Sequence, residues 1–346
     1  MNGKKEMPYT LELNPTNRCN LKCGYCWQQN FGDIDKEDKL LTEKLLNIVR
    51  EAAELGVKEI RIPGSGEPLI REDIIDVMEE IKKNKIHGLL ITNGTLLDKE
   101  KINKIIDMKW DCLTFSFDSS DKEINDYFRG KDSFDVLKKN LLLLKKIKQE
   151  KESKLPLVRF NIVITNKNYK TLSNILEFAK EASCEDVEFQ PLTVWSKNSE
   201  RFKLTENQLA EFKNMIPTIK SLAEETNIYT NIGDFLGSDV VEKAAGEMDK
   251  LMFQKNEENK FLELPCFEPW YNMIILSEGK VTACSMAGPG YGDSVIKKSL
   301  KEVWLGDYYK NLRKALLDKK LPEYCKKCCA VVFVENQKIK SRLKNG

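Results

Sequence analysis

Three cysteines stand within eight residues near the amino terminus, at Cys19, Cys23 and Cys26 in the spacing C-x3-C-x2-C. Thiolates at this density are typical metal ligands, but three of them suit structural zinc poorly, because zinc closes its shell with four protein donors. A 4Fe–4S cluster held by three thiolates instead keeps one iron with an open position for a small molecule. The spacing therefore favours such a cluster over an incomplete zinc loop or three unrelated thiols.

A second group of cysteines lies in the carboxyl-terminal third of the chain, at Cys266, Cys284, Cys325 and Cys328. Four thiolates ending in a C-x2-C pair are typical of a zinc knuckle and equally of a second iron–sulfur cluster. Cys329, beside the pair, is expected to have no role. Cys112 and Cys184 lie in or next to apolar segments and are expected to be small core residues.

The composition excludes several classes of partner. Lys+Arg and Asp+Glu nearly balance at 56 and 54 in 346 residues, so no polyanion such as a nucleic acid is expected. No apolar run follows the basic start of the chain or reaches membrane length, so neither secretion nor a membrane span is expected. Cysteines at metal-like spacings in a long chain favour a reducing cytoplasm over a disulfide-rich secreted protein.

Strand-like and amphipathic helical segments alternate through the first half of the chain. The apolar patterns predict strands at 9–14, 59–62, 88–92, 112–118, 158–164 and 186–192. They predict helices between them at 42–55, 73–85, 98–108, 133–150 and 169–182. Such alternation predicts parallel strands joined by right-handed crossovers, in either an open sheet or a barrel.

The unusual polar and glycine-rich runs all follow the predicted strands. The cysteine loop follows the first strand, Gly-Ser-Gly-Glu-Pro at 64–68 the second, Thr-Asn-Gly at 92–94 the third, and Ser-Phe-Asp at 116–118 ends the fourth. The carboxyl ends of parallel strands are where α/β proteins build their sites. We therefore expect these runs to meet at one edge of the sheet.

The cysteine motif, with an aromatic residue (Tyr25) before its last cysteine, resembles the signature of the radical S-adenosylmethionine (SAM) superfamily. The resemblance implies a partial (β/α)6 TIM-like barrel and a 4Fe–4S cluster whose open iron chelates the amino and carboxylate groups of SAM. It implies that an electron, from a reductant such as ferredoxin or flavodoxin, cleaves SAM to a 5′-deoxyadenosyl radical that abstracts a substrate hydrogen. Tyr25 would pack near the adenine.

The same resemblance implies SAM contacts at the strand ends. The run at 64–68 resembles the family's Gly-Gly-Glu-Pro, with Ser65 in place of a glycine, and glycines there let backbone carbonyls approach the SAM ammonium. Arg129 fits the arginine that pairs with the SAM carboxylate. The alternatives are a plain turn, a helix cap or a solvated arginine. The expected cofactor-binding set is Gly64, Ser65, Gly66, Glu67, Asn93, Ser116, Asp118, Arg129, Gln190 and Leu192.

The carboxyl-terminal cysteines, which flank a predicted hairpin with a Glu-Gly turn at 278–279, resemble the SPASM/Twitch families. The chain lacks the longer cysteine series of a full SPASM domain, so the resemblance implies the shorter Twitch type with one auxiliary 4Fe–4S cluster. Such a fully ligated cluster would accept an electron from a substrate radical, which favours a net two-electron oxidation.

Three domains are expected: the barrel at 1–196, a helical bridge without chemistry of its own at 197–260, and the auxiliary domain at 261–346. Alternation within the first and sixth strands sets Glu12 and Glu188 opposite the apolar face, toward the barrel lumen, where either could contact substrate. Together with Tyr25 they are the catalytic candidates. His87, the only histidine, is expected at the surface.

The leading functional hypothesis is a radical SAM oxidoreductase that oxidises a small molecule such as an alcohol or sugar. A second hypothesis within the same family is a maturase that modifies a peptide or protein. A third, from another class, is a structural zinc-binding scaffold without SAM turnover.

Overall fold

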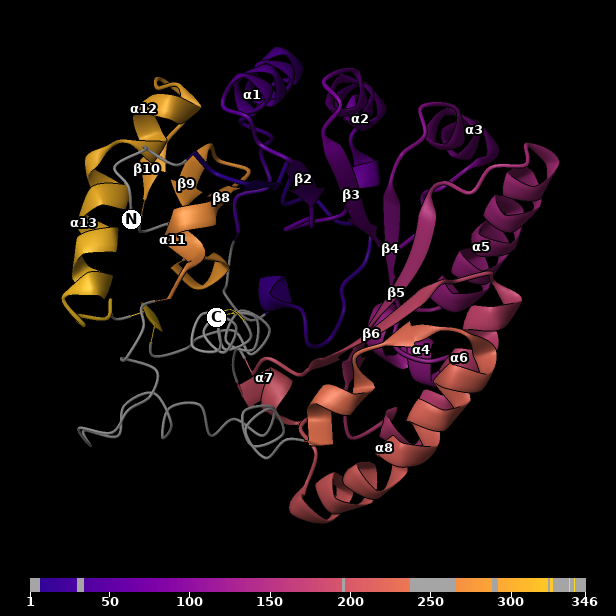
Figure 1. The fold of residues 1–346 in the computed structure, drawn as a ribbon. Coiled ribbons are helices and arrows are strands. Elements are labelled where there is room, and N and C mark those ends of the chain that lie inside the picture. Colours follow the sequence, from indigo (N-terminus) through magenta and orange to yellow (C-terminus); the bar gives the residue numbers. More distant parts are fainter. Residues whose placement is uncertain are drawn as a thin grey trace.

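The computed structural model describes residues 7–29, 34–194, 197–236, 266–287 and 292–322, together with Tyr324, Cys325, Asn336 and Ile339. Ten strands in these residues form one sheet in the order β10-β9-β8-β1-β2-β3-β4-β5-β6-β7. The strands from β8 to β7 pair in parallel, and β9 and β10 are antiparallel. The sheet curves into an arc with helices along its outer side and does not close (Figure 1). The predicted partial barrel is confirmed.

The six predicted strands are all present, with ends that move by a residue or two. They are β1 Thr10–Leu13, β2 Glu59–Ile62, β3 His87–Thr92, β4 Cys112–Ser116, β5 Leu157–Ile164 and β6 Asp186–Pro191. The helices of the outer layer match their predictions as closely. They are α1 Thr42–Glu54, α2 Ile74–Lys83, α3 Lys99–Asp107, α5 Ser133–Glu150 and α6 Leu172–Glu181, the last preceded by a short 3-10 turn at Tyr169–Thr171.

Side-chain alternation separates an apolar convex face from a polar concave face. In β5, Phe160 and Ile162 are fully buried against the helices, while Arg159 and Asn161 point the other way. Helix α1 buries residues that recur at helical spacing, including Leu45, Ile48 and Val49. Each such side chain stabilises the fold by about 1.5–3 kcal/mol. The hydrophobic core therefore lies between the sheet and its outer helices.

Between the barrel strands, one helix was not predicted from the sequence. Helix α4, Lys122–Arg129, starts at Asp121, whose carboxylate accepts a hydrogen bond from the amide of Ile124 at 3.1 Å. Its buried residues include the polar Asn125 and Arg129 as well as Phe128. Because polar side chains occupy its buried face, the helix carries no recognisable apolar stripe.

The segment after β6 does more than bridge two domains. It contains α7 Lys197–Glu200 and α8 Glu206–Thr226, which begins with the predicted capping box at Thr205, and α8 packs on α6. The two-residue strand β7, Tyr229–Thr230, then pairs in parallel with β6. This part of the predicted bridge extends the barrel sheet, and the rest of it, from residue 237, lies outside the described residues. The boundary at 196 stays a prediction.

The predicted carboxyl-terminal hairpin is present as β8 Asn272–Ile275 and β9 Lys280–Thr282, with Gly279 at a φ of 78° in the turn. Strand β8 pairs in parallel with β1, so the hairpin continues the barrel sheet. Around it lie α11 Glu268–Tyr271, β10 Asp293–Ser294, α12 Leu300–Trp304 and α13 Asp307–Leu317 (Figure 1). Within the described part of the chain, no helix combines the length and apolarity that a membrane span needs.

Candidate active site at the carboxyl ends of the strands

The loop that follows β1 carries Cys19, Cys23 and Cys26, and all three side chains are partly buried. Its backbone is wound tightly: the amide of Cys26 donates to the carbonyl of Cys23 at 3.0 Å, and the amide of Leu21 donates to Sγ of Cys19 at 3.4 Å. A hydrogen bond from Gly24 N to the carbonyl of Phe128, 3.0 Å long, ties the loop to the end of α4. The conformation of the loop is therefore fixed by its own turns and by α4, which is distant in sequence.

The three thiols share one electrostatic environment. Burial raises the pKa of all three, that of Cys23 to about 12. The neighbouring cysteines raise the pKa values of Cys19 and Cys23 further, whereas Arg129 lowers them, so the sulfurs lie within each other's field. Raised pKa values favour the protonated thiols in the absence of a metal, and metal binding releases their protons.

The glycine-rich run after β2 is hydrogen-bonded to the backbone at the start of the cysteine loop. The amide of Gly66 donates to the carbonyl of Thr16 at 3.0 Å, and the amide of Glu67 donates to that of Arg18 at 2.8 Å. A Cβ on Gly66 would lie 2.1 Å from the Arg18 carbonyl oxygen, so only glycine fits. The sequence assigned these glycines to SAM contact, and the structure adds that Gly66 supports the cysteine loop. Gly64, at a φ of 73°, forms the turn before it.

Glu67 links the ends of two strands from a buried position. Its carboxylate accepts hydrogen bonds from the hydroxyl of Thr92 at 2.6 Å and from the amides of Leu69 at 3.1 Å and Asn93 at 2.7 Å. Burial raises its pKa, although these donors lower it. Ser65 Oγ donates to the Asn14 side chain at 3.1 Å. In this structure, therefore, Glu67 and Ser65 serve to join β1, β2 and β3.

Asn93 belongs to a small polar cluster beside Cys19. Its Nδ2 donates to Oδ1 of Asn20 at 3.0 Å, and its Oδ1 accepts from the amide and hydroxyl of Thr95. Asn20 in turn donates to the Thr95 hydroxyl at 2.8 Å. Asn20 and Thr95 were not among the predicted site residues, although Asn20 adjoins Cys19 and Thr95 lies two residues after Asn93.

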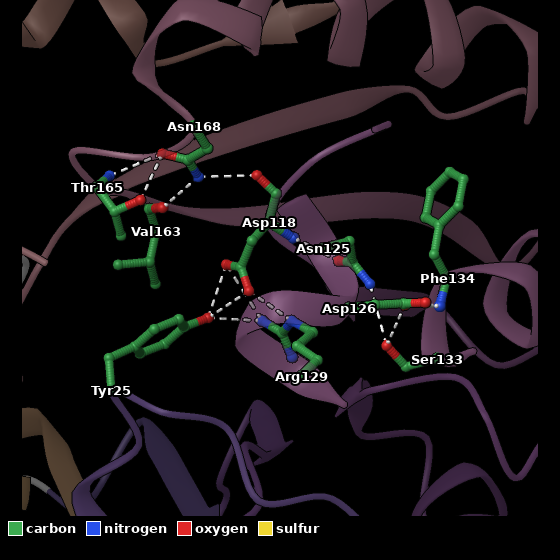
Figure 2. Close-up of polar contacts among 10 residues, drawn as sticks. All are labelled: Tyr25, Asp118, Asn125, Asp126, Arg129, Ser133, Phe134, Val163, Thr165 and Asn168. Carbon is green, nitrogen blue, oxygen red and sulfur yellow. Dashed lines mark hydrogen bonds and ion pairs between the residues drawn. The ribbon is translucent and has the colours of Figure 1, made fainter. Parts of the chain in front are cut away.

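Figure 2 shows a buried ion pair at the centre of the site. Nε of Arg129 lies 2.7 Å from the carboxylate of Asp118, which is fully buried. The Tyr25 hydroxyl donates to the same carboxylate at 2.7 Å and accepts from Nη2 of Arg129 at 2.9 Å. Burial lowers the pKa of Arg129, but the charge of Asp118 outweighs it and holds that pKa well above the ordinary value. The sequence predicted all three residues, but not that they bind one another.

Neighbouring amides hold this ion pair in place (Figure 2). Asn125 of α4 accepts from the Asp118 amide at 3.1 Å, and Asn168 donates to the Asp118 carbonyl at 2.8 Å. One side of Tyr25 packs edge-on against Phe128 and Phe202, and this apolar cluster includes the predicted Leu192. The amides and the aromatic residues together fix the orientation of the Tyr25 ring.

The concave face continues toward β6. Ser116 of β4 lies in register with Asn161 of β5, and Asn161 with Glu188 of β6. The Asn161 side-chain oxygen is buried and accepts no hydrogen bond from the described part of the chain. Gln190, two residues beyond Glu188, lies on the same face in register with Val163. The sequence analysis missed Asn161, although alternation along its strand would have placed it opposite the apolar face.

Glu12 occupies the opposite wall of the concave face. Nδ2 of Asn272 in β8 donates to Glu12 at 3.2 Å and to Glu268 at 3.1 Å. Burial raises the pKa of Glu12, the nearby Arg61 lowers it, and Glu268 raises it further. The predicted orientation of Glu12, away from the apolar face, is therefore present. His87 begins β3, is about half exposed, and lies 3.4 Å from Glu59.

The auxiliary cysteines are partly described. Cys266 precedes α11, Cys284 follows β9, and Cys325 lies at a turn, each partly buried, while Cys328 and Cys329 lie outside the described residues. Burial raises the pKa of Cys325 to about 12. The Cys284 and Cys325 thiols both raise the pKa values of Tyr308 and Tyr324, so all four side chains are neighbours. Cys112 and Cys184 are buried, as predicted.

The donor set at the amino-terminal loop fits an iron–sulfur cluster. Three thiols lie on one preshaped loop, and a cubane cluster needs more widely spaced thiolates than a single ion does. The loop therefore offers three soft donors of the kind that iron–sulfur clusters take, with the polar groups of Asn93 and Asp118 beside it.

Comparison with known proteins gives two family matches. The family described as the radical SAM superfamily matches residues 13–179, and the family described as an iron–sulfur cluster-binding (SPASM) domain matches residues 266–329. The first match spans the cysteine loop and strands β2 to β5, and the second begins at Cys266. The two matches therefore coincide with the two cysteine groups.

Curated relatives include enzymes with different substrates. A GTP 3′,8-cyclase from Clostridium perfringens is 43% identical over 103 residues, which cover 28% of this chain and 31% of that protein. A probable GTP 3′,8-cyclase from Methanothermobacter marburgensis is 30% identical over 234 residues, covering 65% and 73%. A PqqA peptide cyclase from Granulibacter bethesdensis is 32% identical over 176 residues, covering 51% and 45%. The first of these alignments spans less than a third of its relative.

Solved structures share the fold over most of the chain. Streptococcus suis SuiB bound to its precursor peptide SuiA has a TM-score of 0.66 at 21% identity, covering 89% of this chain and 67% of that one. The enzyme anSMEcpe with bound SAM and a peptide has a TM-score of 0.61 at 20% identity, covering 93% and 86%. These structures show the fold, and the two family matches together with the relative from Methanothermobacter marburgensis show the family: the chain belongs to the radical SAM superfamily, as an enzyme with a SPASM domain that uses SAM and 4Fe–4S clusters.

Proposed function

We propose that this enzyme is a maturase that modifies a peptide or protein. The observation that carries the proposal is the shared fold along about nine tenths of the chain with two proteins solved with bound peptides. A PqqA peptide cyclase among the relatives supports the same substrate class. We therefore place peptide modification ahead of the small-molecule oxidation that the sequence favoured.

In this proposal Cys19, Cys23 and Cys26 hold the cluster that binds SAM. Once bound, the cluster and SAM supply a 5′-deoxyadenosyl radical that removes a hydrogen atom from the substrate. The ion pair of Asp118 with Arg129 fixes Tyr25 and thereby one wall of the SAM site. Arg129 keeps its proposed role: its guanidinium would pair with the SAM carboxylate as well as with Asp118. The other predicted cofactor contacts are retained: Gly64, Ser65, Gly66, Glu67, Asn93, Ser116, Gln190 and Leu192.

A second cluster would take the electron that a substrate radical must lose. Cys266, Cys284, Cys325 and Cys328 are its proposed ligands, in a region that joins the barrel through β8 and β1. Because this cluster would be fully ligated, it offers no position for SAM and can only transfer electrons. The reaction would then be a net two-electron oxidation with an external reductant only for SAM cleavage. Glu12 and Glu188 remain candidates for proton acceptor.

A small-molecule substrate is the second candidate, because two of the three relatives described above are named for GTP. A triphosphate binds to cationic side chains and helix amino termini. On the concave side of the described strands β1, β2, β5 and β6, however, carboxylates outnumber arginines: Glu12, Glu59, Asp186 and Glu188 stand against Arg61 and Arg159. This charge balance favours the peptide over a nucleotide.

Deuterium transfer distinguishes the two candidates. The anaerobically reconstituted enzyme would be incubated with SAM, a reductant and extract from cells grown in heavy water, split into peptide-size and metabolite fractions. We expect deuterated 5′-deoxyadenosine from the peptide fraction, with loss of the signal after protease treatment. Transfer from the metabolite fraction, or from GTP alone, would overturn the proposal.

Metal content tests the cofactor assignment independently. We expect about eight irons per chain, as two cubane clusters require, and no zinc. One zinc with no iron at the carboxyl-terminal site would end the proposed electron transfer and leave SAM cleavage intact. One 5′-deoxyadenosine formed per modified peptide, without added oxidant, would support the two-electron reaction.

A further inference from the structure

The side chain of Gln28 bridges two segments of the amino-terminal site. Gln28 lies in a short 3-10 turn, Trp27–Gln29, directly after the third cysteine of the loop. Its Nε2 donates to the carbonyl oxygen of Asn17 at 2.8 Å and to that of Ser65 at 2.7 Å. Because a side-chain amide has two N–H donors, these two hydrogen bonds use both of them.

The bond to Asn17 closes the cysteine loop at its base. Asn17 is buried and comes two residues before Cys19, and Gln28 comes two residues after Cys26. The backbone amide of Gln28 donates to the Cys26 thiol, and the amide of Gln29 donates to the Cys26 carbonyl at 3.0 Å. Gln28 therefore joins the start of the segment that carries all three cysteines to its last cysteine.

The bond to Ser65 fixes a backbone carbonyl of the glycine-rich run. The Ser65 hydroxyl is held as well, since it donates to Oδ1 of Asn14 at 3.1 Å. Nδ2 of Asn14 in turn donates to the carbonyl of Ile275 in β8 at 3.1 Å. Gln28 and Asn14 together therefore give the Ser65 residue a defined orientation at the end of β2.

The Ser65 carbonyl can still accept a second hydrogen bond, because a carbonyl oxygen has two lone pairs and Gln28 uses one of them. In the proposed function, this run presents backbone carbonyls to the ammonium of SAM. An ammonium is a compact cation with three donors. A carbonyl that is already oriented binds such a group at a smaller entropic cost than a mobile one.

We propose that Gln28 is a positioning residue for SAM, which orients the Ser65 carbonyl toward the SAM ammonium. The inference rests on the cofactor assignment of the proposed function and is independent of whether the substrate is a peptide or a small molecule. Gln28 acts through Ser65, because both of its side-chain donors are already engaged. Since its backbone also holds Cys26, the same residue fixes one cluster ligand and one SAM contact.

The test compares two ligands on the anaerobically reconstituted full chain. SAM carries the ammonium, whereas 5′-methylthioadenosine shares its adenosine but lacks the amino-acid part. Equilibrium dialysis gives both dissociation constants, and iron analysis reports cluster assembly. Gln28→Met should weaken SAM binding at least about tenfold, as loss of an orienting partner does at metal sites, and leave 5′-methylthioadenosine binding within about twofold. Its iron content should match that of the wild type.

Two further variants sharpen the result. Gln29→Met is the matched control, because Gln29 is the adjacent residue, has the same side chain and is exposed. It should bind SAM as the wild type does. In Gln28→Glu, an ionised carboxylate cannot donate to the Ser65 carbonyl, but it would attract any ammonium within its reach. We expect this variant to lose at least as much SAM affinity as Gln28→Met.

Several outcomes would overturn the inference. Unchanged SAM affinity in Gln28→Met would remove the proposed role, and an equal loss for both ligands would indicate general damage to the site. An iron loss as large as that of Cys26→Ala would assign Gln28 to the cluster alone. SAM affinity in Gln28→Glu at or above that of the wild type would mean that residue 28 contacts SAM directly.

The two proposals fail in different ways. The expected loss of SAM affinity, together with deuterium transfer only from the metabolite fraction, would refute the maturase and leave the role of Gln28 standing. Transfer from the peptide fraction with unchanged SAM affinity in Gln28→Met would refute this inference alone.

Discussion

The two cysteine groups of this enzyme are held in place very differently. The amino-terminal loop is fastened by contacts from several elements: the glycine-rich run after β2, the Asn93 cluster after β3, and Asp118 and Arg129 after β4. The described carboxyl-terminal cysteines lie around one hairpin at the edge region of the sheet, beside Tyr308 and Tyr324. A cluster that must orient SAM needs a rigid surround, whereas one that only accepts electrons needs proximity.

The largest effect is expected from Cys23→Ala. Loss of a direct ligand should lower 5′-deoxyadenosine formation more than about 100-fold, since even outer partners of metal ligands are worth up to that much. Product formation by chromatography measures it. Cys112→Ala removes a buried thiol from β4 and should leave formation unchanged. Similar losses in both variants would mean that the loop has no special role.

Cys284→Ala sharpens the contrast between the groups. We expect iron content to fall by about four per chain while SAM cleavage without substrate continues and modified peptide disappears. Iron analysis and mass spectrometry of the peptide provide the two readouts. If SAM cleavage stopped together with peptide modification, the two clusters would not have separate tasks.

Asp118→Asn tests the contribution of the buried ion pair beside the amino-terminal cysteine loop. The change leaves the buried Arg129 guanidinium without its counter-charge, which should lower the free energy of unfolding by about 3–5 kcal/mol. Denaturant unfolding of the iron-free chain is the measurement. Asp121→Asn is the control, because asparagine caps a helix about as well as aspartate. Equal destabilisation of the two variants would contradict the importance of the ion pair.

Gly66→Ala should disturb the loop by steric contact. Its Cβ would lie 2.1 Å from the Arg18 carbonyl, whereas Gly233 has nothing within 4 Å of the equivalent position. We expect a cost of about 1–3 kcal/mol and incomplete cluster reconstitution for Gly66→Ala. Gly233→Ala should reconstitute fully, and iron content after reconstitution decides between the outcomes.

The smallest effect is expected in the pH dependence of stability, through Asp126 of α4, whose carboxylate binds the start of α5. Burial raises the pKa of Asp126, but hydrogen bonds from the Phe134 amide, Lys122 and Ser133 outweigh it and lower that pKa to about 2. Since the pKa is lower in the folded state, Asp126 stabilises the fold above about pH 4, and this is lost as pH falls toward 2. The stability difference between wild type and Asp126→Asn should therefore shrink on acidification. A difference independent of pH would show that the charge of Asp126 is not involved.

Much of the barrel could be predicted from the sequence because each strand and each outer helix buries one regular apolar stripe. Helix α4 escaped prediction because Asn125 and Arg129, both polar, occupy its buried side. Strand β7 is two residues long and exists only through its pairing with β6. Both elements depend on partners that local periodicity does not reveal.

The candidate site was predictable to a similar extent. The spacing of Cys19, Cys23 and Cys26 identified the loop, and the strand-end motifs identified its neighbours. Asn20, Thr95 and Asn161 carry no motif of their own, so their positions emerged only from the packing of the loop and the register of β5.

The sequence by itself determined which donors the chain possesses and that they follow consecutive strands, because ligand spacing and side-chain alternation are local properties. Only the tertiary structure decided that Arg129 pairs with Asp118 beneath Tyr25, and that β8 joins β1 across some 260 residues of chain. Such encounters depend on the register of strands and helices distant in sequence. Burial makes the pairing of Arg129 with Asp118 necessary, because a charge removed from water is strongly destabilising without its partner.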